Sequence, residues 1–453
     1  SPDMNNLVFL SLPGFRPSDL DQMPRLSALM ASGDRQPLSA SFPAVTWPVQ
    51  ANMLTGCRPN QHGVVANGFY WRESHEVEMW TASNEKILAP QVWDLAHQDS
   101  PQIKSAVWFP MLSKECGADY ICMPAPVHNP DGSESLWCYT RPTEYYGDLL
   151  DALGHFPLKN FWGPLSSIDS TEWIASSAVL AATRFQPEFF FLYLPHLDYA
   201  AQKCGPESPE AGQAVEELDL VIGKLVDGLE AAYDGSNLTW LAASEYVITE
   251  VDHVVYPNRL LRDAGLLSVR VEDGLEYLDL VGSRAWALVD HQFAHVFVRD
   301  ADPVAIDRVV QIFAQQKGIA EVLAGTRRAN RAMDHERAGD VILISSPHSW
   351  QAYYWWEDDD RAPDFARTVD IHRKPGYDPV ELHLDMAGRG VPLDASLVRG
   401  SHGAPVQSQS QCGIVLSSRQ GVLGEKPLAD VDMAGVILRQ FQEPPLGEGV
   451  PTD

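Results

Sequence analysis

Short apolar runs alternate with longer amphipathic segments along the first half of the chain. The apolar runs are typical of buried strands, and the segments with apolar residues at helical spacing are typical of helices packed on a sheet. The expected strands are residues 7–12, 104–109, 188–194 and 238–243, and the expected helices are residues 19–31, 171–185 and 211–233. This order predicts an α/β fold, with a mostly parallel sheet between two layers of helices. Such sheets bind ligands at the carboxyl ends of their strands.

Two stretches interrupt this alternation and carry many turn signals, residues 68–163 and residues 269–399. The second stretch contains short strand-like runs of its own, so it predicts an inserted cap subdomain. The expected core is then discontinuous, with residues 4–268 and 400–441, and residues 442–453 form a proline-rich C-terminal tail. Loops and caps around a rigid sheet commonly select the substrate.

The charge balance narrows the choice of partners. The chain of 453 residues has a formal net charge of −28 and 45% hydrophobic residues, which is enough apolar material for a large core. A field of this sign repels polyanions, so we expect neither a nucleic acid polymer nor an anionic membrane surface as a partner. A small phosphorylated substrate would need local cations to enter. Solubility alone is the simpler reading of the acidity.

The cysteines and the N-terminal segment bear on location. Six cysteines are scattered without zinc-ribbon spacing, which favours reduced thiols over a disulfide framework. The segment that follows Met4 lacks the basic start of a secretory signal, and the chain has no long uncharged apolar run. The expected location is the cytoplasm, with a mature secreted form as the open alternative.

A candidate nucleophile lies in residues 42–56, which include the run Phe42-Pro43-Ala44-Val45-Thr46. We interpret this run as a strand end that turns into a short helix capped by Thr46. The hydroxyl would then lie in the field of a helix N-terminus, where an anion is favoured. A threonine before a helix is more often only a cap. Together with Pro59-Asn60-Gln61-His62-Gly63, however, the segment resembles the nucleophile segment of the alkaline phosphatase superfamily, in its nucleotide pyrophosphatase/phosphodiesterase branch.

Three later segments resemble the same family in the same order. Asp198 and Gln202 follow an expected strand, where the family has an Asp and a His that bind one metal ion. Glu245 and Tyr246 follow the strand 238–243, where the family has an Asp and a His. His402 matches the last imidazole ligand of the family. The resemblance thus extends over nearly the whole chain.

The resemblance implies a chemistry. In the family, two divalent ions hold the phosphoryl oxygens, activate a Thr or Ser hydroxyl and stabilise an in-line transition state, and water then releases the phosphorylated enzyme. It implies that this chain is a metal-dependent hydrolase of a phosphodiester or nucleotide pyrophosphate in a small metabolite, with Thr46 or a metal-bound water as the nucleophile. Pro13 stands where the family has an Asp, and proline offers no donor atom.

The implied cofactor is one or two divalent metal ions, Zn, Mn or Mg. Asp198, Gln202 and His402 would hold one ion, because a Gln oxygen can serve in place of an imidazole. The ion beside the nucleophile would keep only Glu245 and Tyr246. Carboxylate and amide oxygens suit magnesium or manganese better than zinc. A single oxygen-rich ion is therefore the preferred expectation.

Other donors in the chain could have replaced the lost ligands. Asp252 and His253 follow Glu245 closely, and His291 and His295 are four residues apart. Residues 381–385 would place three donors on one face of a strand. Alternating charged residues are more often the solvated face of a strand.

Two classes of function remain open at this stage. The first is the hydrolase described above, acting on a small phosphorylated metabolite. The second is a catalytically degenerate member of the superfamily that acts as a binding or scaffold protein. The retained Thr46, Asp198, Glu245 and His402 favour the first class, and the altered ligand positions favour the second.

Overall fold

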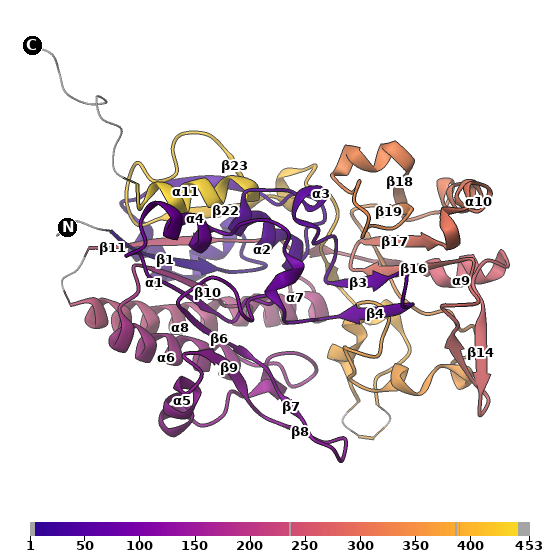
Figure 1. The fold of residues 1–453 in the computed structure, drawn as a ribbon, viewed down its shortest axis with the longest axis horizontal. Coiled ribbons are helices and arrows are strands. Elements are labelled where there is room, and N and C mark those ends of the chain that lie inside the picture. Colours follow the sequence, from indigo (N-terminus) through magenta and orange to yellow (C-terminus); the bar gives the residue numbers. More distant parts are fainter. Residues whose placement is uncertain (1–4, 235–236, 386, 389, 443–453) are drawn as a thin grey trace, which may run out of the picture.

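The central element of the fold is a nine-stranded sheet with strand order β23-β2-β22-β11-β1-β10-β5-β6-β9 (Figure 1). The structure is a computed structural model that describes residues 5–234, 237–385, 387–388 and 390–442. Strands β11, β1, β10, β5 and β6 pair in parallel. Strand β22 pairs antiparallel with β11, and the edge strand β9 pairs antiparallel with β6. The expected α/β fold with a mostly parallel sheet is confirmed. The strands of this sheet are β1 (Asn6–Ser11), β2 (Arg35–Ser39), β5 (Ser105–Trp108), β6 (Tyr120–Pro124), β9 (Cys138–Arg141), β10 (Phe189–Tyr193), β11 (Leu238–Ala243), β22 (Gly413–Ser417) and β23 (Leu428–Ala429).

Helices cover both faces of this sheet because its central strands are apolar on both sides. Side chains alternate between the faces along each strand. Val8 and Phe190 pack on one side with helices α1, α6 and α8, and Phe9 and Phe191 pack on the other side with α2, α4 and α11. The rings of Phe9 and Phe191 stack with their centroids 5.1 Å apart. The helices are α1 (Pro24–Met30), α2 (Thr46–Thr55), α3 (Pro59–His62), α4 (Val92–Asp99), α5 (Tyr145–Leu153), α6 (Ile168–Phe185), α7 (Leu197–Cys204), α8 (Pro209–Tyr233), α9 (Pro257–Asp263), α10 (Pro303–Ala314) and α11 (Met433–Arg439).

The expected helix over residues 19–31 is in fact two elements. A 3-10 helix, η1 (Pro17–Gln22), comes first, and α1 begins at Pro24. Proline lacks an amide hydrogen and fits the first turn of a helix but not its interior, so the chain restarts its helix there. The expected strands at 7–12, 104–109, 188–194 and 238–243 match β1, β5, β10 and β11 to within one residue at each end.

A second hydrophobic cluster forms the part of the molecule that we call the cap. The cap contains a four-stranded antiparallel sheet with the order β16-β17-β19-β18. Most residues of the cluster lie between Val251 and Val398 in the sequence. The hairpin of β3 and β4 reaches from the core into this cluster, where Tyr70 and Met79 pack (Figure 1). The boundaries at 269 and 399 stay a prediction, and the expected tail from 443 lies outside the described residues. The remaining strands are β3 (Gly68–Trp71), β4 (Glu76–Met79), β7 (Val127–His128), β8 (Glu134–Ser135), β12 (Thr249–Glu250), β13 (His253–Val255), β14 (Val269–Glu272), β15 (Leu275–Leu278), β16 (Ala285–Asp290), β17 (Phe293–Val298), β18 (Ile319–Ala324), β19 (Val341–Ser345), β20 (Ser349–Gln351) and β21 (Gly400–Ser401).

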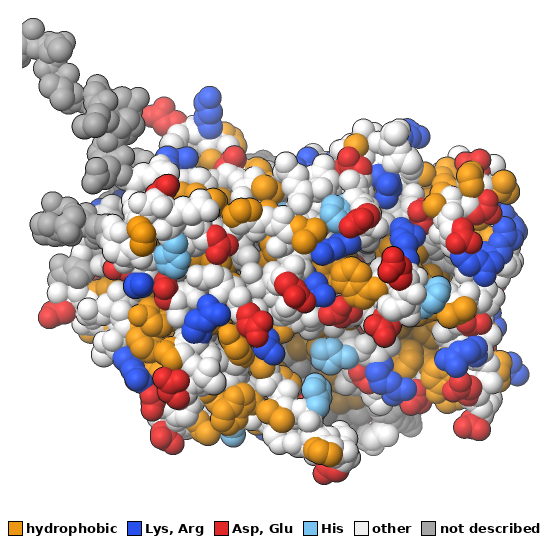
Figure 2. All heavy atoms as spheres, in the orientation of Figure 1, with side chains coloured by type: hydrophobic (Ala, Val, Ile, Leu, Met, Phe, Trp, Pro, Cys, Tyr) orange, Lys and Arg blue, Asp and Glu red, His pale blue; other side chains and the backbone are white. Residues whose placement is uncertain are grey.

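The surface mixes charges of both signs. Figure 2 shows Lys and Arg side chains interspersed with Asp and Glu on the visible face rather than gathered into one basic area. All six cysteines are free, as the spacing predicted. Among the described residues, no helix combines the length and the apolar character that crossing a bilayer requires.

A buried ion cluster fixes the cap segment 368–383. The ammonium group of Lys374, 1% exposed, donates to Asp378 at 2.8 Å and to Glu381 at 2.7 Å. Burial opposes the charge on Lys374, but the two carboxylates outweigh it and raise its pKa. Glu381 also accepts from the indole of Trp162 at 3.0 Å, which ties the segment to the core. The expected strand over residues 381–385 is wrong, since residues 379–383 form a 3-10 turn around this cluster.

We expect Lys374→Met to lower the free energy of unfolding of the cap by about 3 to 5 kcal/mol, because it leaves two buried carboxylates without their cation. Urea titration followed by tryptophan fluorescence measures this change. The neighbouring pair of Arg373 with Asp364 is half exposed on both sides and provides the matched control. Arg373→Ala should change the stability by less than about 1 kcal/mol. Equal losses in the two variants would contradict the role given to Lys374.

Candidate active site

The site forms where three parallel strands end at the same edge of the sheet. Ser11, Tyr193 and Ala243 are the last residues of β1, β10 and β11, and they lie side by side in the register. The turns after these strands carry Asp198, on the first turn of α7, and the pair Glu245 and Tyr246. The chain therefore brings residues that are far apart in sequence to one rim.

Thr46 is the first residue of α2 and not its cap. The N-cap is Val45, whose extended backbone precedes the helix and whose side chain makes no capping bond. The predicted capping role of Thr46 is therefore wrong, and its hydroxyl lies instead 3.2 Å from the hydroxyl of Tyr246. The amide of Trp47 donates to the side chain of Asn67 at 3.0 Å and holds the start of the helix.

Tyr246 connects the other predicted site residues. Its hydroxyl donates to Oδ1 of Asp198 at 3.1 Å, and its ring stacks on His402 with centroids 3.6 Å apart. The Nδ1 atom of His402 bonds to the carbonyl of Ala44 at 2.7 Å, so it carries the proton. The Nε2 atom lies 3.8 Å from Oδ1 of Asp198 and has no hydrogen-bond partner within the described part of the chain.

Glu245 is held in a strained backbone conformation at the rim. Its φ of 57° lies in the left-handed region, which is uncommon for a residue with a side chain. One carboxyl oxygen accepts from Ser11 at 2.8 Å and from Gln50 at 2.7 Å. Burial raises the pKa of Glu245 to about 8 and that of Asp198 to about 7, against the lowering effect of their hydrogen bonds. Burial therefore disfavours the charged form of both carboxyl groups.

The cap contributes Tyr377, which the sequence did not single out, and His291, which it offered as a substitute donor. The hydroxyl of Tyr377 donates to Oε1 of Gln202 at 2.5 Å. The ring of Tyr377 stacks on His291 at 3.6 Å, and His291 lies 4.0 Å from His402, both measured between ring centroids. No local pattern marks Tyr377, which comes from the segment fixed by Lys374.

Of the substitute donors considered from the sequence, His291 lies near the site, but the expected partners do not join it. His295 bonds to the carbonyl of Val65 and does not pair with His291. Asp252 and His253 make their backbone bonds to His348, and the ring of His253 faces the carbonyl of Lys317. These contacts lie in the cap and join neither residue to the site.

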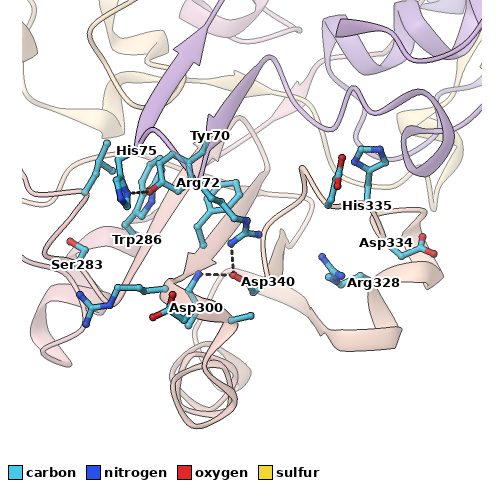
Figure 3. Close-up of a pocket in the computed structure, with 16 residues that line it drawn as sticks. Tyr70, Arg72, His75, Ser283, Trp286, Asp300, Arg328, Asp334, His335 and Asp340 are labelled. Carbon is cyan, nitrogen blue, oxygen red and sulfur yellow. Dashed lines mark hydrogen bonds and ion pairs between the residues drawn. The ribbon is translucent and has the colours of Figure 1, made fainter.

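The larger cavity of the structure does not coincide with the candidate catalytic residues. The space next to Tyr246 and His402 has a volume of about 10 Å³, which is room for at most a single water. A cavity of about 600 Å³ lies in the cap instead, between Tyr70, Trp286 and Arg328 (Figure 3). Arg72 points into it and pairs with Asp340 at 2.9 Å. None of the predicted site residues belongs to the described lining of this cap cavity.

The donor set does not fit the metal ions that the resemblance implied. In the described ranges, no group of three or more His, Cys, Asp and Glu side chains lies close enough together to hold an ion. The oxygens of Asp198 and Gln202 that were expected to bind one ion accept hydrogen bonds from Tyr246 and Tyr377. The expectation of a single ion at Asp198, Gln202 and His402 therefore finds no support in the geometry.

Comparisons with known proteins agree with the resemblance. Residues 7–378 match the family model described as type I phosphodiesterase / nucleotide pyrophosphatase. A pyrophosphatase/phosphodiesterase of Schizosaccharomyces pombe is 27% identical over 231 residues, which are 50% of this chain and 41% of that protein. Ectonucleotide pyrophosphatase/phosphodiesterase family member 3 of Mus musculus is 22% identical over 56% of this chain and 26% of its own length. The chain thus spans less than half the length of these curated relatives.

Two solved structures share the fold over nearly the whole chain. Phosphonoacetate hydrolase from Sinorhizobium meliloti 1021, in complex with phosphonoformate, has a TM-score of 0.63 and 17% identity, with 97% of this chain and 96% of that chain covered. An inactive variant of murine ectonucleotide pyrophosphatase/phosphodiesterase 5, in complex with AMP, has a TM-score of 0.61 and 14% identity, with 96% and 95% covered. At these identities the likeness shows the fold alone.

We expect Tyr377→Phe to lower the free energy of unfolding by about 1 to 3 kcal/mol, because it leaves the buried oxygen of Gln202 without a donor. Differential scanning calorimetry reports this change. Tyr277→Phe is the matched control, since the hydroxyl of Tyr277 donates to Asp364 at 3.1 Å in an exposed part of the cap. If both variants melted like the parent chain, the contact between the cap and Gln202 would not hold the site closed.

Proposed function

The chain belongs to the type I phosphodiesterase / nucleotide pyrophosphatase family of the alkaline phosphatase superfamily, and from that premise we propose that it hydrolyses a phosphodiester or nucleotide pyrophosphate bond of a small metabolite through the hydroxyl of Thr46. The family and its neighbours are phosphoester hydrolases of the phosphodiesterase/pyrophosphatase type. One observation carries the assignment of the nucleophile. Thr46 begins a ten-residue helix at the carboxyl edge of the sheet, and its hydroxyl lies 3.2 Å from the hydroxyl of Tyr246.

The hydrogen bonds around Thr46 support a role as nucleophile. Tyr246 donates its only hydroxyl proton to Asp198, so its oxygen is left to accept the proton of Thr46. The lone pairs of the Thr46 oxygen then remain free for attack on phosphorus. The N-terminus of α2 favours an anion beside this oxygen, as a transferring phosphoryl group would be.

The substrate class follows from size and charge. Solved neighbours bind phosphonoformate and AMP, and both ligands are small phosphorus-containing anions. A chain with a net charge of −28 disfavours a nucleic acid polymer in the same site. The space next to Tyr246 and His402 is about 10 Å³, which is smaller than such a substrate, so the rim must open before one binds there.

The metal ion and the location expected from the sequence are treated separately. Members of the family typically depend on divalent metal ions such as zinc, but metal dependence is not part of the proposal because the donor set does not fit. The cytoplasm remains the proposed location, and the six free thiols support a reducing compartment.

A second candidate function is binding of the same class of metabolite without turnover. The specific observation in its favour is that the phenol of Tyr246 contacts both Thr46 and Asp198 and closes the site. Ligand-induced thermal shifts with AMP, without turnover of any phosphoester, would favour this candidate over hydrolysis.

We expect Thr46→Ala to reduce the turnover of a bis-aryl phosphodiester or an aryl nucleotide ester at least about 100-fold, because it removes the attacking oxygen. Thr46→Ser should retain measurable turnover, since it keeps the hydroxyl. Release of the aryl product, followed by absorbance, measures both.

Thr55→Ala provides the control on the same helix, because the hydroxyl of Thr55 bonds to the carbonyl of Ala51 at the far end of α2. This variant should keep the turnover of the parent chain. Thr46→Ala with unchanged turnover would exclude Thr46 as the nucleophile.

A further inference from the structure

We propose that this chain holds no divalent ion at the rim, because the phenols of Tyr246 and Tyr377 hydrogen-bond to the oxygens that an ion would bind and occupy the space beside them. The inference rests on the proposed function for the identity of the site, but it concerns what the site contains rather than turnover. Its basis is the set of hydrogen bonds around Asp198, Gln202 and Thr46.

The first step concerns Asp198, a ligand that the expected single-ion site requires. The hydroxyl of Tyr246 lies 3.1 Å from Oδ1 of Asp198 and 3.2 Å from Oγ1 of Thr46. A phenol that touches both atoms occupies the region between the nucleophile and the carboxylate. An ion that bridged them would have to displace the buried ring of Tyr246, which is 2% exposed and stacked on His402.

The second step concerns Gln202, the expected third ligand of the same ion. Its amide oxygen accepts from Tyr377, and its amide nitrogen is a donor that cannot bind a cation. Withdrawal of Tyr377 would also separate its ring from His291. The neutral donor from the cap therefore satisfies the oxygen that an ion would otherwise bind.

The third step concerns the donors that remain. Among the described residues, Nε2 of His402 and Oε2 of Glu245 are buried without a hydrogen-bond partner, and Asp198 bonds to Tyr246 through Oδ1 alone. The other oxygen of Glu245 already accepts from Ser11 and Gln50, and Pro13 has no donor atom. A structural or catalytic zinc ion takes at least three protein ligands close together, and in the described ranges no group of three or more His, Cys, Asp and Glu side chains lies close enough to hold an ion.

The physical consequence is that neutral side chains replace cations at this rim. Two phenols, one amide and one imidazole supply hydrogen-bonding groups where the family supplies metal charge. The positive end of α2 is then the remaining fixed source of positive potential at Thr46. Any turnover through Thr46 should accordingly resist chelating agents.

The experiment measures metal content directly. Chelator-treated protein is incubated with zinc, manganese or magnesium, desalted and analysed for its elements, and its melting temperature is recorded with and without each ion. We expect no stoichiometric ion and no shift in melting temperature for the parent chain. One or more tightly held ions per chain would overturn the inference.

A gain-of-binding variant tests the stated cause. Gln202→His combined with Tyr246→His adds two imidazoles beside Asp198 and His402, so the variant should take up zinc stoichiometrically and melt several degrees higher in its presence. Gln407→His combined with Tyr277→His adds the same residue types outside the site and should gain neither. Tyr246→His alone serves if the double variant does not fold, as judged by circular dichroism. A folded variant that still rejects zinc would show that these side chains do not exclude the ion, and would overturn the inference.

Turnover separates this inference from the proposed function. A metal-free parent chain with turnover that requires Thr46 and resists EDTA supports both. A metal-free chain without turnover supports the inference and removes the hydrolase proposal. A chain that binds metal stoichiometrically overturns the inference, whether or not Thr46 proves to be the nucleophile.

Discussion

The contacts of Tyr246 are the interaction on which the rest of the site depends. One phenol joins Thr46 at the start of α2 to Asp198 on α7, and its ring stacks on His402 beside β21. These residues come from three distant segments of the chain. A single buried aromatic side chain thus connects these segments, and it does so without charge.

The sheet makes this arrangement possible. Parallel strands end at a common edge, so every turn after a strand delivers a side chain to the same place. The apolar strands behind that edge are packed on both faces, which buries the turns as well. Burial then raises the pKa of both Asp198 and Glu245, because a charged carboxylate loses its solvation there.

The cap closes the site by means of a different kind of contact. Lys374 sits between two buried carboxylates and fixes the segment that carries Tyr377. Trp162 connects the same cluster to the core. A buried ion cluster tolerates little displacement, because each partner would be left unpaired. Opening the rim at Tyr377 and destabilising the cap would therefore disturb the same contacts.

The sequence by itself determined the fold class, the central strands and the position of Thr46 on the rim. Those features follow from period-2 and helical spacing and from turn residues, which act over a few neighbours in the chain. Tertiary structure decided that Thr46 is not a cap, that residues 381–385 turn around Lys374, and that Asp252 and His253 lie with the cap. It also brought Tyr377 to Gln202 across 175 residues of sequence. Local patterns cannot specify such a contact, because it depends on how separate elements pack and not on the residues next to it.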